Sequence, residues 1–140
     1  MKILLAVDGS PYTKKMLAYL TTHLDMFAGE HEFTALTVQH ALPPRARAAV
    51  GSEVVDNYYA EEAAKVLDPV VKFLTRHNLK TKTISKVGQA GETIGKIAES
   101  GKYDMVIMGS RGHGALGSLV MGSVATKVLA NCQVPVLLVR

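Results

Sequence analysis

Five of the chain's twelve glycines lie in the stretch MGSRGHGALGSLVMGSVATKV, residues 108–128, between an apolar strand pattern and an apolar helix pattern. Glycine loses more conformational entropy on folding than any other residue, so the cluster needs a reason. We expect Ser123 to be the N-cap of the following helix, and the backbone N–H groups of Gly122, Ser123 and Val124 to have no partners. Because unpaired N–H groups at a helix start favour anions, the stretch predicts a phosphate site.

The glycine loop, residues 109–122, does not match the standard phosphate motifs. Residues 117–123 have the glycine spacing of G-x-x-x-x-G-K-[ST] but lack its lysine, and no G-x-G-x-x-G follows the first strand. The absence of G-x-S-x-G argues against a hydrolase nucleophile elbow. A side chain at Gly109 or Gly112 would keep the backbone away from phosphate oxygens. Gly114 and Gly117 are interpreted as turn residues, and a role in turns alone is the alternative for the whole cluster.

Three polar side chains accompany this loop. Asp8 ends the first apolar strand, where its carboxylate suits ribose hydroxyls but equally suits an N-cap or an Asx-turn. Arg111 and His113 lie within the loop, where each either approaches a phosphate or is simply solvated. The five histidines are dispersed without the spacing of a ligand pair, so the sequence predicts no metal site built from protein ligands alone.

Apolar periodicity predicts strands that alternate with helices along the chain. A first helix begins at Pro11 and ends at a Gly29 C-cap. Residues 41–51 are predicted to be a loop. A long helix begins near Ser52, with Pro69 expected to kink or restart it. The strands are expected at residues 2–7, 32–40, 79–88, 103–109 and 134–140, and the last two helices at 90–101 and 123–131.

This alternation predicts a single α/β domain, residues 1–140, in which an open parallel sheet carries helices on both faces. Inward-facing side chains are expected at Met16, Leu17, Leu20, Leu24 and Phe27 of the first helix, at Val55, Tyr59, Ala63, Val66, Val70 and Phe73 of the second, and at Ile94, Ile97 and Ala98 of the third. Ligands of such sheets bind beyond the carboxyl ends of the strands. There the first, second and fourth strands deliver residues 7–10, residues 37–40 and Gly109.

The composition excludes several classes of function. A net charge of +4 without any basic run gives no footprint for nucleic acid, and no apolar stretch is long enough to cross a membrane. The single cysteine, Cys132, excludes an internal disulfide and is expected to be a buried, inert thiol. The sequence therefore predicts a cytoplasmic protein that contacts neither nucleic acid nor a membrane.

The pattern G-x2-G-x9-G-[ST] is present as Gly109, Gly112, Gly122 and Ser123. It follows DMVIMGSRG and leads into GSVATKVLANCQVPVLLVR, and the chain starts with KILLAVDGS. With these motifs the sequence resembles the universal stress proteins over its whole length.

The resemblance implies a Rossmann-like, adenine nucleotide alpha hydrolase-like domain with strand order 3-2-1-4-5. It implies that Asp8 contacts the adenosine, that the backbone of Val38 reads the adenine edge, and that the glycine motif wraps the ribose and phosphates. The ligand implied is ATP, with Mg²⁺ or Mn²⁺ on its phosphates. The spacer HGALGSLVM lacks the Lys or Arg of many members, which leaves AMP or ADP open. The expected nucleotide-binding residues are Ala6, Val7, Asp8, Val38, Met108, Gly109, Arg111, Gly112, His113, Gly122, Ser123 and Val124.

The function expected from the resemblance is that of a nucleotide-binding module in stress signalling, which forms a homodimer through its last strand, Val134–Val139. No general base or phosphate-loop lysine is placed for catalysis, so the chain is not expected to be an enzyme. A slow ATPase or phosphotransferase and a nucleotide-free dimeric interaction module are the alternatives.

Overall fold

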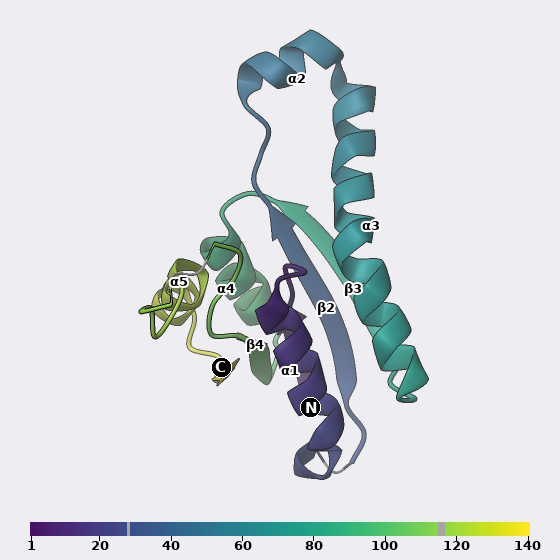
Figure 1. Cartoon of the computed structure of the whole chain (residues 1–140), viewed down its shortest axis with the longest axis vertical. Coiled ribbons are helices and arrows are strands. Elements are labelled where there is room, and N and C mark those ends of the chain that lie inside the picture. The colour runs from purple at the N-terminus through teal and green to yellow at the C-terminus, as the bar shows by residue number, and fades with distance from the viewer. Residues whose placement is uncertain (28, 115–116) are drawn as a thin grey trace.

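The computed structural model describes residues 1–27, 29–114 and 117–140 (Figure 1). Its five strands form one parallel sheet in the order β3-β2-β1-β4-β5, which confirms the predicted order. The strands are β1 (Lys2–Ala6), β2 (Glu32–Gln39), β3 (Thr81–Val87), β4 (Met105–Gly109) and β5 (Val136–Val139). The helices are α1 (Pro11–Thr22), α2 (Pro44–Val50), α3 (Ser52–Arg76), α4 (Ala90–Ser100) and α5 (Ser123–Asn131), with a 3₁₀ turn, η1 (Leu24–Phe27).

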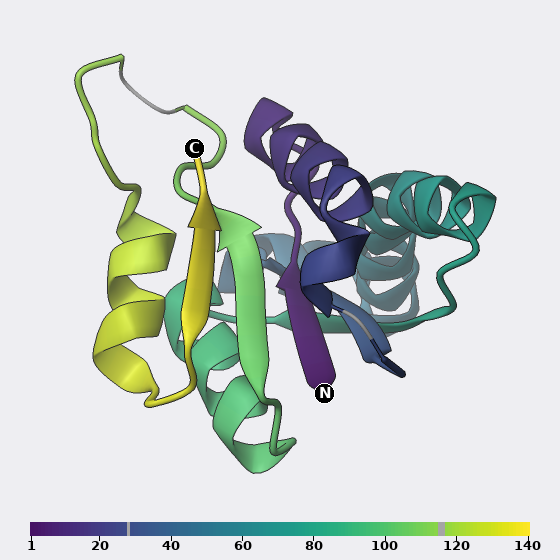
Figure 2. The same ribbon diagram turned by 90° about the horizontal axis from the view of Figure 1, so that it is seen from below.

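The two faces of the sheet carry separate helix pairs, as Figure 2 shows from below. Alternate residues of a strand point to opposite faces. In the central strand β1, Ile3 and Leu5 pack with residues of α1 and α3, whereas Leu4 and Ala6 pack with residues of α4 and α5. Both faces of β1 are therefore buried, which explains its continuous apolar sequence. The arrangement confirms the prediction of helices on both faces of the sheet.

The first two predicted helices differ from the observed ones at their ends. The C-cap of α1 is His23 rather than Gly29, because the chain leaves the α-helix at Thr22 and continues as η1. Pro69 lies inside α3 and does not restart it. Pro69 cannot donate to the carbonyl of Lys65, but both residues are exposed, so water can hydrate that carbonyl.

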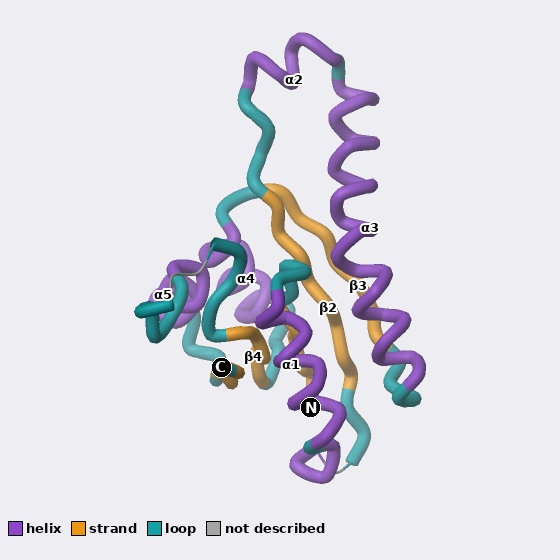
Figure 3. Tube along the Cα trace, viewed as in Figure 1, coloured by secondary structure: helices purple, strands orange, loops and turns teal. Residues whose placement is uncertain are grey.

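The predicted loop 41–51 is wrong, since most of it forms α2. Pro44 occupies the first turn, where its fixed φ angle suits a helix, and alanines and arginines follow it. No residue of α2 is buried. Together with the start of α3, α2 forms an arm that projects beyond the sheet (Figure 3).

The inward residues are largely as expected. The predicted Met16, Leu17, Leu20, Val55, Ala63, Val70, Ile94 and Ala98 are buried, and Leu24, Tyr59, Val66, Phe73 and Ile97 are half-buried. Leu67 and Leu74 of α3 were not predicted and are also buried. The side chain of Phe27 lies outside the described part. Cys132 is buried and unpaired, as predicted. Among the described helices, none has the length and apolarity needed to cross a membrane.

Candidate functional site

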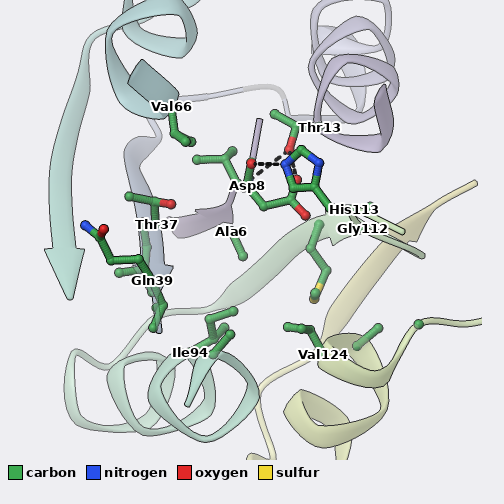
Figure 4. A pocket seen from close by; sticks show the side chains of 18 of the residues that line it. Ala6, Asp8, Thr13, Thr37, Gln39, Val66, Ile94, Gly112, His113 and Val124 are labelled. Carbon is green, nitrogen blue, oxygen red and sulfur yellow. Dashed lines mark hydrogen bonds between the residues drawn. The ribbon is translucent and has the colours of Figure 1, made fainter. Parts of the chain in front are cut away.

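A cavity of about 660 Å³ lies at the carboxyl ends of β1, β2 and β4, between α3 and the start of α5 (Figure 4). Its volume is within the range typical of sites for small molecules and cofactors. The structure brings every one of the predicted binding residues to its wall: Ala6, Val7, Asp8, Val38, Met108, Gly109, Arg111, Gly112, His113, Gly122, Ser123 and Val124.

The β1–α1 turn, residues 7–10, fixes Asp8 at the mouth of the cavity. The Asp8 N–H donates to Thr13 Oγ1 (3.0 Å), and the Thr13 hydroxyl donates back to Asp8 Oδ1 (2.9 Å). The Ser10 N–H donates to the same Oδ1 (2.9 Å). The carboxylate thus closes an Asx-turn, as predicted, whereas the alternative that Asp8 is the N-cap is wrong, because the N-cap of α1 is Ser10. Oδ2 stays turned toward Gly112, so the turn leaves one carboxylate oxygen for a ligand.

The tip of β2 extends past the end of β1 and offers backbone groups to the cavity. The Leu36 carbonyl accepts the N–H of Val7 (2.9 Å), so Leu36 directs its backbone groups toward β1. The Gln39 carbonyl accepts the N–H of Gly88 (2.9 Å), so Gln39 directs its groups toward β3. Backbone groups alternate along a strand, so the N–H and C=O of Val38 face the side of Leu36. Val38 therefore presents a donor and an acceptor next to one another, beyond the last β1 partner.

Three glycines of the loop are held against their neighbours. A Cβ atom at Gly109 would lie 2.6 Å from Tyr12 Cβ, and one at Gly112 would lie 2.6 Å from Asp8 Oδ2. At Gly122 the nearest atom would be Arg111 Cα, 3.2 Å away. A Cβ atom at Gly117 would meet nothing within 4 Å. Close packing thus accounts for Gly109, Gly112 and Gly122, and Gly117 has no such constraint.

The start of α5 differs from its prediction. Gly122, not Ser123, is the N-cap, because Ser123 already has helical geometry. The N–H of Gly122 donates to the Ser110 carbonyl (2.7 Å), so the prediction that it is unpaired is wrong. Within the described residues, nothing accepts the N–H groups of Ser123 and Val124. These two groups are the ones that an anion at the cavity could bind.

The charged side chains around the cavity are mostly engaged elsewhere. His113 Nε2 donates to the backbone carbonyl of Asp8 (2.7 Å). The Arg111 guanidinium carbon lies 5.6 Å from the centre of the Tyr12 ring, over which Lys15 also lies. Glu62 of α3 accepts a hydrogen bond from Lys65 (2.8 Å), and this bond and the coulombic attraction raise the pKa of Lys65.

Several lining residues were missed by sequence reasoning. Thr13 is in the first turn of α1 and carries no motif of its own, although its spacing from Asp8 fits a turn-closing hydroxyl. Ser110 follows Gly109 directly, and its buried hydroxyl has no partner among the described residues. Tyr58 and Glu62 of α3 were also missed, whereas Thr37, Gln39 and His40 belong to the segment 37–40 that was expected at this edge of the sheet.

The donor set does not suit a cation held by protein ligands. Among the described residues, no three His, Cys, Asp or Glu side chains gather as a metal site would require. Of the lining carboxylates, Asp8 uses Oδ1 within its own turn and Glu62 is paired with Lys65. A cation at this cavity would therefore need most of its ligands from a bound molecule.

Comparison with known proteins gives concordant matches. The sequence profile described as the Universal stress protein family matches residues 1–140. A universal stress protein from Thermus aquaticus is 32% identical over 143 residues, covering 99% of this chain and 97% of the relative. The structure of MJ0577, a universal stress protein of Methanocaldococcus jannaschii, superposes with a TM-score of 0.79 at 31% identity, covering 99% of this chain and 94% of that one.

A more distant structure extends the likeness of the fold. A family protein from Arabidopsis thaliana with AMP bound has a TM-score of 0.67 at 16% identity, and the match covers 99% of this chain and 90% of that one. At this identity the comparison establishes the shared fold, and the AMP belongs to the Arabidopsis protein.

Proposed function

The chain belongs to the universal stress protein family, and on that premise we propose that it binds an adenine nucleotide in the cavity between β2, the β1–α1 turn and the glycine loop. One observation carries the proposal: a single cavity is lined by the exposed backbone edge of Val38, the carboxylate of Asp8 and the N–H groups of Ser123 and Val124, which nothing in the described part of the chain accepts. The AMP seen in the Arabidopsis protein supports it.

Each part of the nucleotide has a matching wall in this proposal. The N–H and C=O of Val38 suit the N1 acceptor and the N6 amino donor of adenine, whereas guanine offers a carbonyl and an N–H in the opposite order. Asp8 Oδ2 suits ribose hydroxyls. The N–H groups of Ser123 and Val124 suit phosphate oxygens, aided by the dipole of α5.

We propose ATP as the ligand, with AMP and ADP as alternatives. No Lys or Arg lies in the nine-residue spacer between Gly112 and Gly122, and the described Arg111 side chain rests on Tyr12. Few fixed positive charges are therefore available to neutralise the negative charge of a triphosphate. Mg²⁺ or Mn²⁺ would supply that neutralisation when bound, held mainly by the phosphates.

Calorimetric titration of ATP with Mg²⁺ tests the proposal. Gly122→Val places a side chain against Arg111, so we expect saturable binding by the natural protein and its loss in this variant. Gly117→Val is the matched control, since its side chain enters open space and should leave affinity unchanged. Absence of binding by the natural protein would refute the proposal, and weaker binding of GTP than of ATP would support the assignment of Val38.

We propose that the chain acts as a binding module in stress signalling and not as an enzyme. Phosphoryl transfer requires groups that position a nucleophile and neutralise charge at the γ-phosphate. Of the basic side chains in and after the glycine loop, Arg111 and His113 line the cavity but are engaged with Tyr12 and Asp8. Lys127 does not line the cavity, and its side chain lies against Gly91 of α4. Phosphate release from ATP that disappears with Gly122→Val would instead show an ATPase.

We also propose that the chain is a cytoplasmic homodimer that pairs through β5, the strand at one edge of the sheet. The N–H groups of Val106 and Ser110 donate to Pro135 and Val139, so the backbone groups of Val136 and Leu138 face the open edge. Leu138→Pro removes one such N–H, whereas Leu138→Ala keeps it. Light scattering should give a monomer for the proline variant and a dimer for the alanine variant and the natural protein. A dimer in all three would argue against pairing through β5.

A further inference from the structure

His113 connects two walls of the cavity that are 105 residues apart in the sequence. Its Nε2 lies 2.7 Å from the backbone oxygen of Asp8, and a carbonyl oxygen can only accept, so the ring donates. Figure 4 shows the imidazole beside Asp8, directly after Gly112. The hydrogen bond therefore ties the start of the glycine loop to the β1–α1 turn.

The β1–α1 turn and the glycine loop depend on this hydrogen bond to different degrees. On the turn, Asp8 is also fixed by its own N–H to Thr13, by the Thr13 hydroxyl and by the Ser10 N–H. On the loop, the other described hydrogen bonds lie at its ends, where the Ser110 N–H donates to the Val139 carbonyl and the Gly122 N–H donates to the Ser110 carbonyl, and the Arg111 side chain rests on Tyr12. Loss of the His113 bond should therefore move the loop and leave Asp8 in place.

Close packing gives the bond a second consequence. Gly112 lies so near the Asp8 carboxylate that a Cβ atom there would lie 2.6 Å from Oδ2. The residue next to it in sequence, His113, anchors exactly this approach. One side chain outside the G-x2-G-x9-G-[ST] glycines thus holds the loop backbone near the turn.

We propose that His113 is a positioning residue that holds the glycine loop in the conformation that binds phosphate, so that affinity for the phosphates depends on it while affinity for the nucleoside does not. This inference rests on the proposed function, because it assigns the phosphates to the glycine loop and the nucleoside to Val38 and Asp8. Since Nε2 is occupied by Asp8, His113 acts through the loop backbone and does not need to touch the phosphate.

The experiment compares adenosine, AMP and ATP with Mg²⁺ by calorimetry on the natural protein, His113→Ala and His113→Gln. A hydrogen bond of ordinary strength corresponds to a loss of affinity of roughly threefold to tenfold. We expect that loss for AMP and ATP with His113→Ala, and unchanged affinity for adenosine. Gln carries an N–H donor at a similar reach, so His113→Gln should restore much of the affinity for AMP and ATP.

His77→Ala is the matched control. His77 also has a ring nitrogen bonded to a backbone carbonyl, Phe73 (2.9 Å), but at the end of α3. It should not change the affinity for any of the three ligands. An equal loss for adenosine and ATP with His113→Ala, or no loss at all, would overturn the inference.

Hydrogen exchange of the ligand-free protein separates this inference from the proposed function. The amides of residues 109–114 and 117–122 should exchange faster in His113→Ala than in the natural protein or His113→Gln, and those of residues 7–13 should not. Unchanged exchange in the loop would overturn the positioning role even if ATP binds. If the natural protein binds no nucleotide, the proposed function and the phosphate part of the inference both fail, and faster exchange would uphold only the tie between loop and turn.

Discussion

The β1–α1 turn and the glycine loop face each other across the cavity and are built in opposite ways. The turn is held by hydrogen bonds, three of which join Asp8 to Ser10 and Thr13. The loop depends on the absence of side chains, since Gly109 and Gly112 leave less room than a Cβ atom needs and Gly122 leaves a tight contact. The structure of the β1–α1 turn therefore depends on the polar groups of Asp8, Ser10 and Thr13. The structure of the glycine loop depends on residues that have no Cβ atom.

This difference matches the separate binding roles that we propose for the turn and the loop. A hydrogen-bonded turn keeps a carboxylate at a fixed position, which suits recognition of a nucleoside of constant shape. A loop whose backbone packs closely against its neighbours exposes backbone N–H groups, which can bind phosphate oxygens without any particular side chain. Substitutions that add atoms should damage the loop, and substitutions that remove a hydroxyl should damage the turn.

The largest effect is expected from Gly109→Ala. Its Cβ atom would lie 2.6 Å from Tyr12 Cβ and 3.2 Å from the Arg111 carbonyl oxygen, so α1 or β4 must shift. Overpacking of this kind costs about 1–3 kcal/mol, which urea denaturation would measure. Gly117→Ala is the control, with an expected change within about 0.5 kcal/mol. Equal stability of the two variants would show that close packing does not shape the loop.

On the turn, Thr13→Val should lower stability by about 1–3 kcal/mol, because the Asp8 N–H and Oδ1 both lose their bonds to a buried hydroxyl. Thr13→Ser keeps the hydroxyl and should restore most of that stability. The affinity for adenosine should fall with Thr13→Val as Asp8 loses its fixed position. A stable Thr13→Val protein with natural affinity would mean that the turn does not depend on these bonds.

Gly112→Ala tests the contact between the two walls. Its Cβ atom would displace Asp8 Oδ2, the end of a side chain, so the cost should be smaller, about 1 kcal/mol. In an Asp8→Ala background nothing is displaced, and the same substitution should cost almost nothing. The coupling energy from this double-mutant cycle measures the contact directly. A cycle without coupling would show that Gly112 and the Asp8 carboxylate do not constrain each other.

Much of this arrangement could be predicted from the sequence because it depends on local pattern. The apolar runs predict the strands, and the residues at their carboxyl ends converge on one edge of any such sheet. The contacts that distinguish the two walls could not be predicted. The Gly122 N–H is satisfied by Ser110, twelve residues earlier, and the ring of His113 reaches Asp8 across most of the chain.

The errors in secondary structure have a similar origin. Adjacent prolines at 43 and 44 indicate a loop, yet Pro44 begins α2 because a first helical turn needs no N–H donor. Pro69 indicates a break, yet α3 continues, because the carbonyl that it leaves unpaired is on the exposed side. At Pro69 the solvent exposure of the site decides the outcome, and exposure is a property of the assembled fold.

The smallest effect is expected at Ser110. This residue is in the loop, where removing atoms should do no harm, but it carries a hydroxyl, and loss of a hydroxyl should damage a hydrogen-bonded turn. Its side chain is 3% exposed, and its hydroxyl has no partner among the described residues. A buried hydroxyl without a partner costs stability, so Ser110→Ala should leave the ligand-free protein unchanged or stabilise it by up to about 1 kcal/mol. If a bound phosphate satisfies that hydroxyl, the same variant should bind ATP more weakly. Thermal unfolding with and without ATP measures both, and a stability loss without ligand would show that Ser110 belongs with the hydrogen-bonded turn after all.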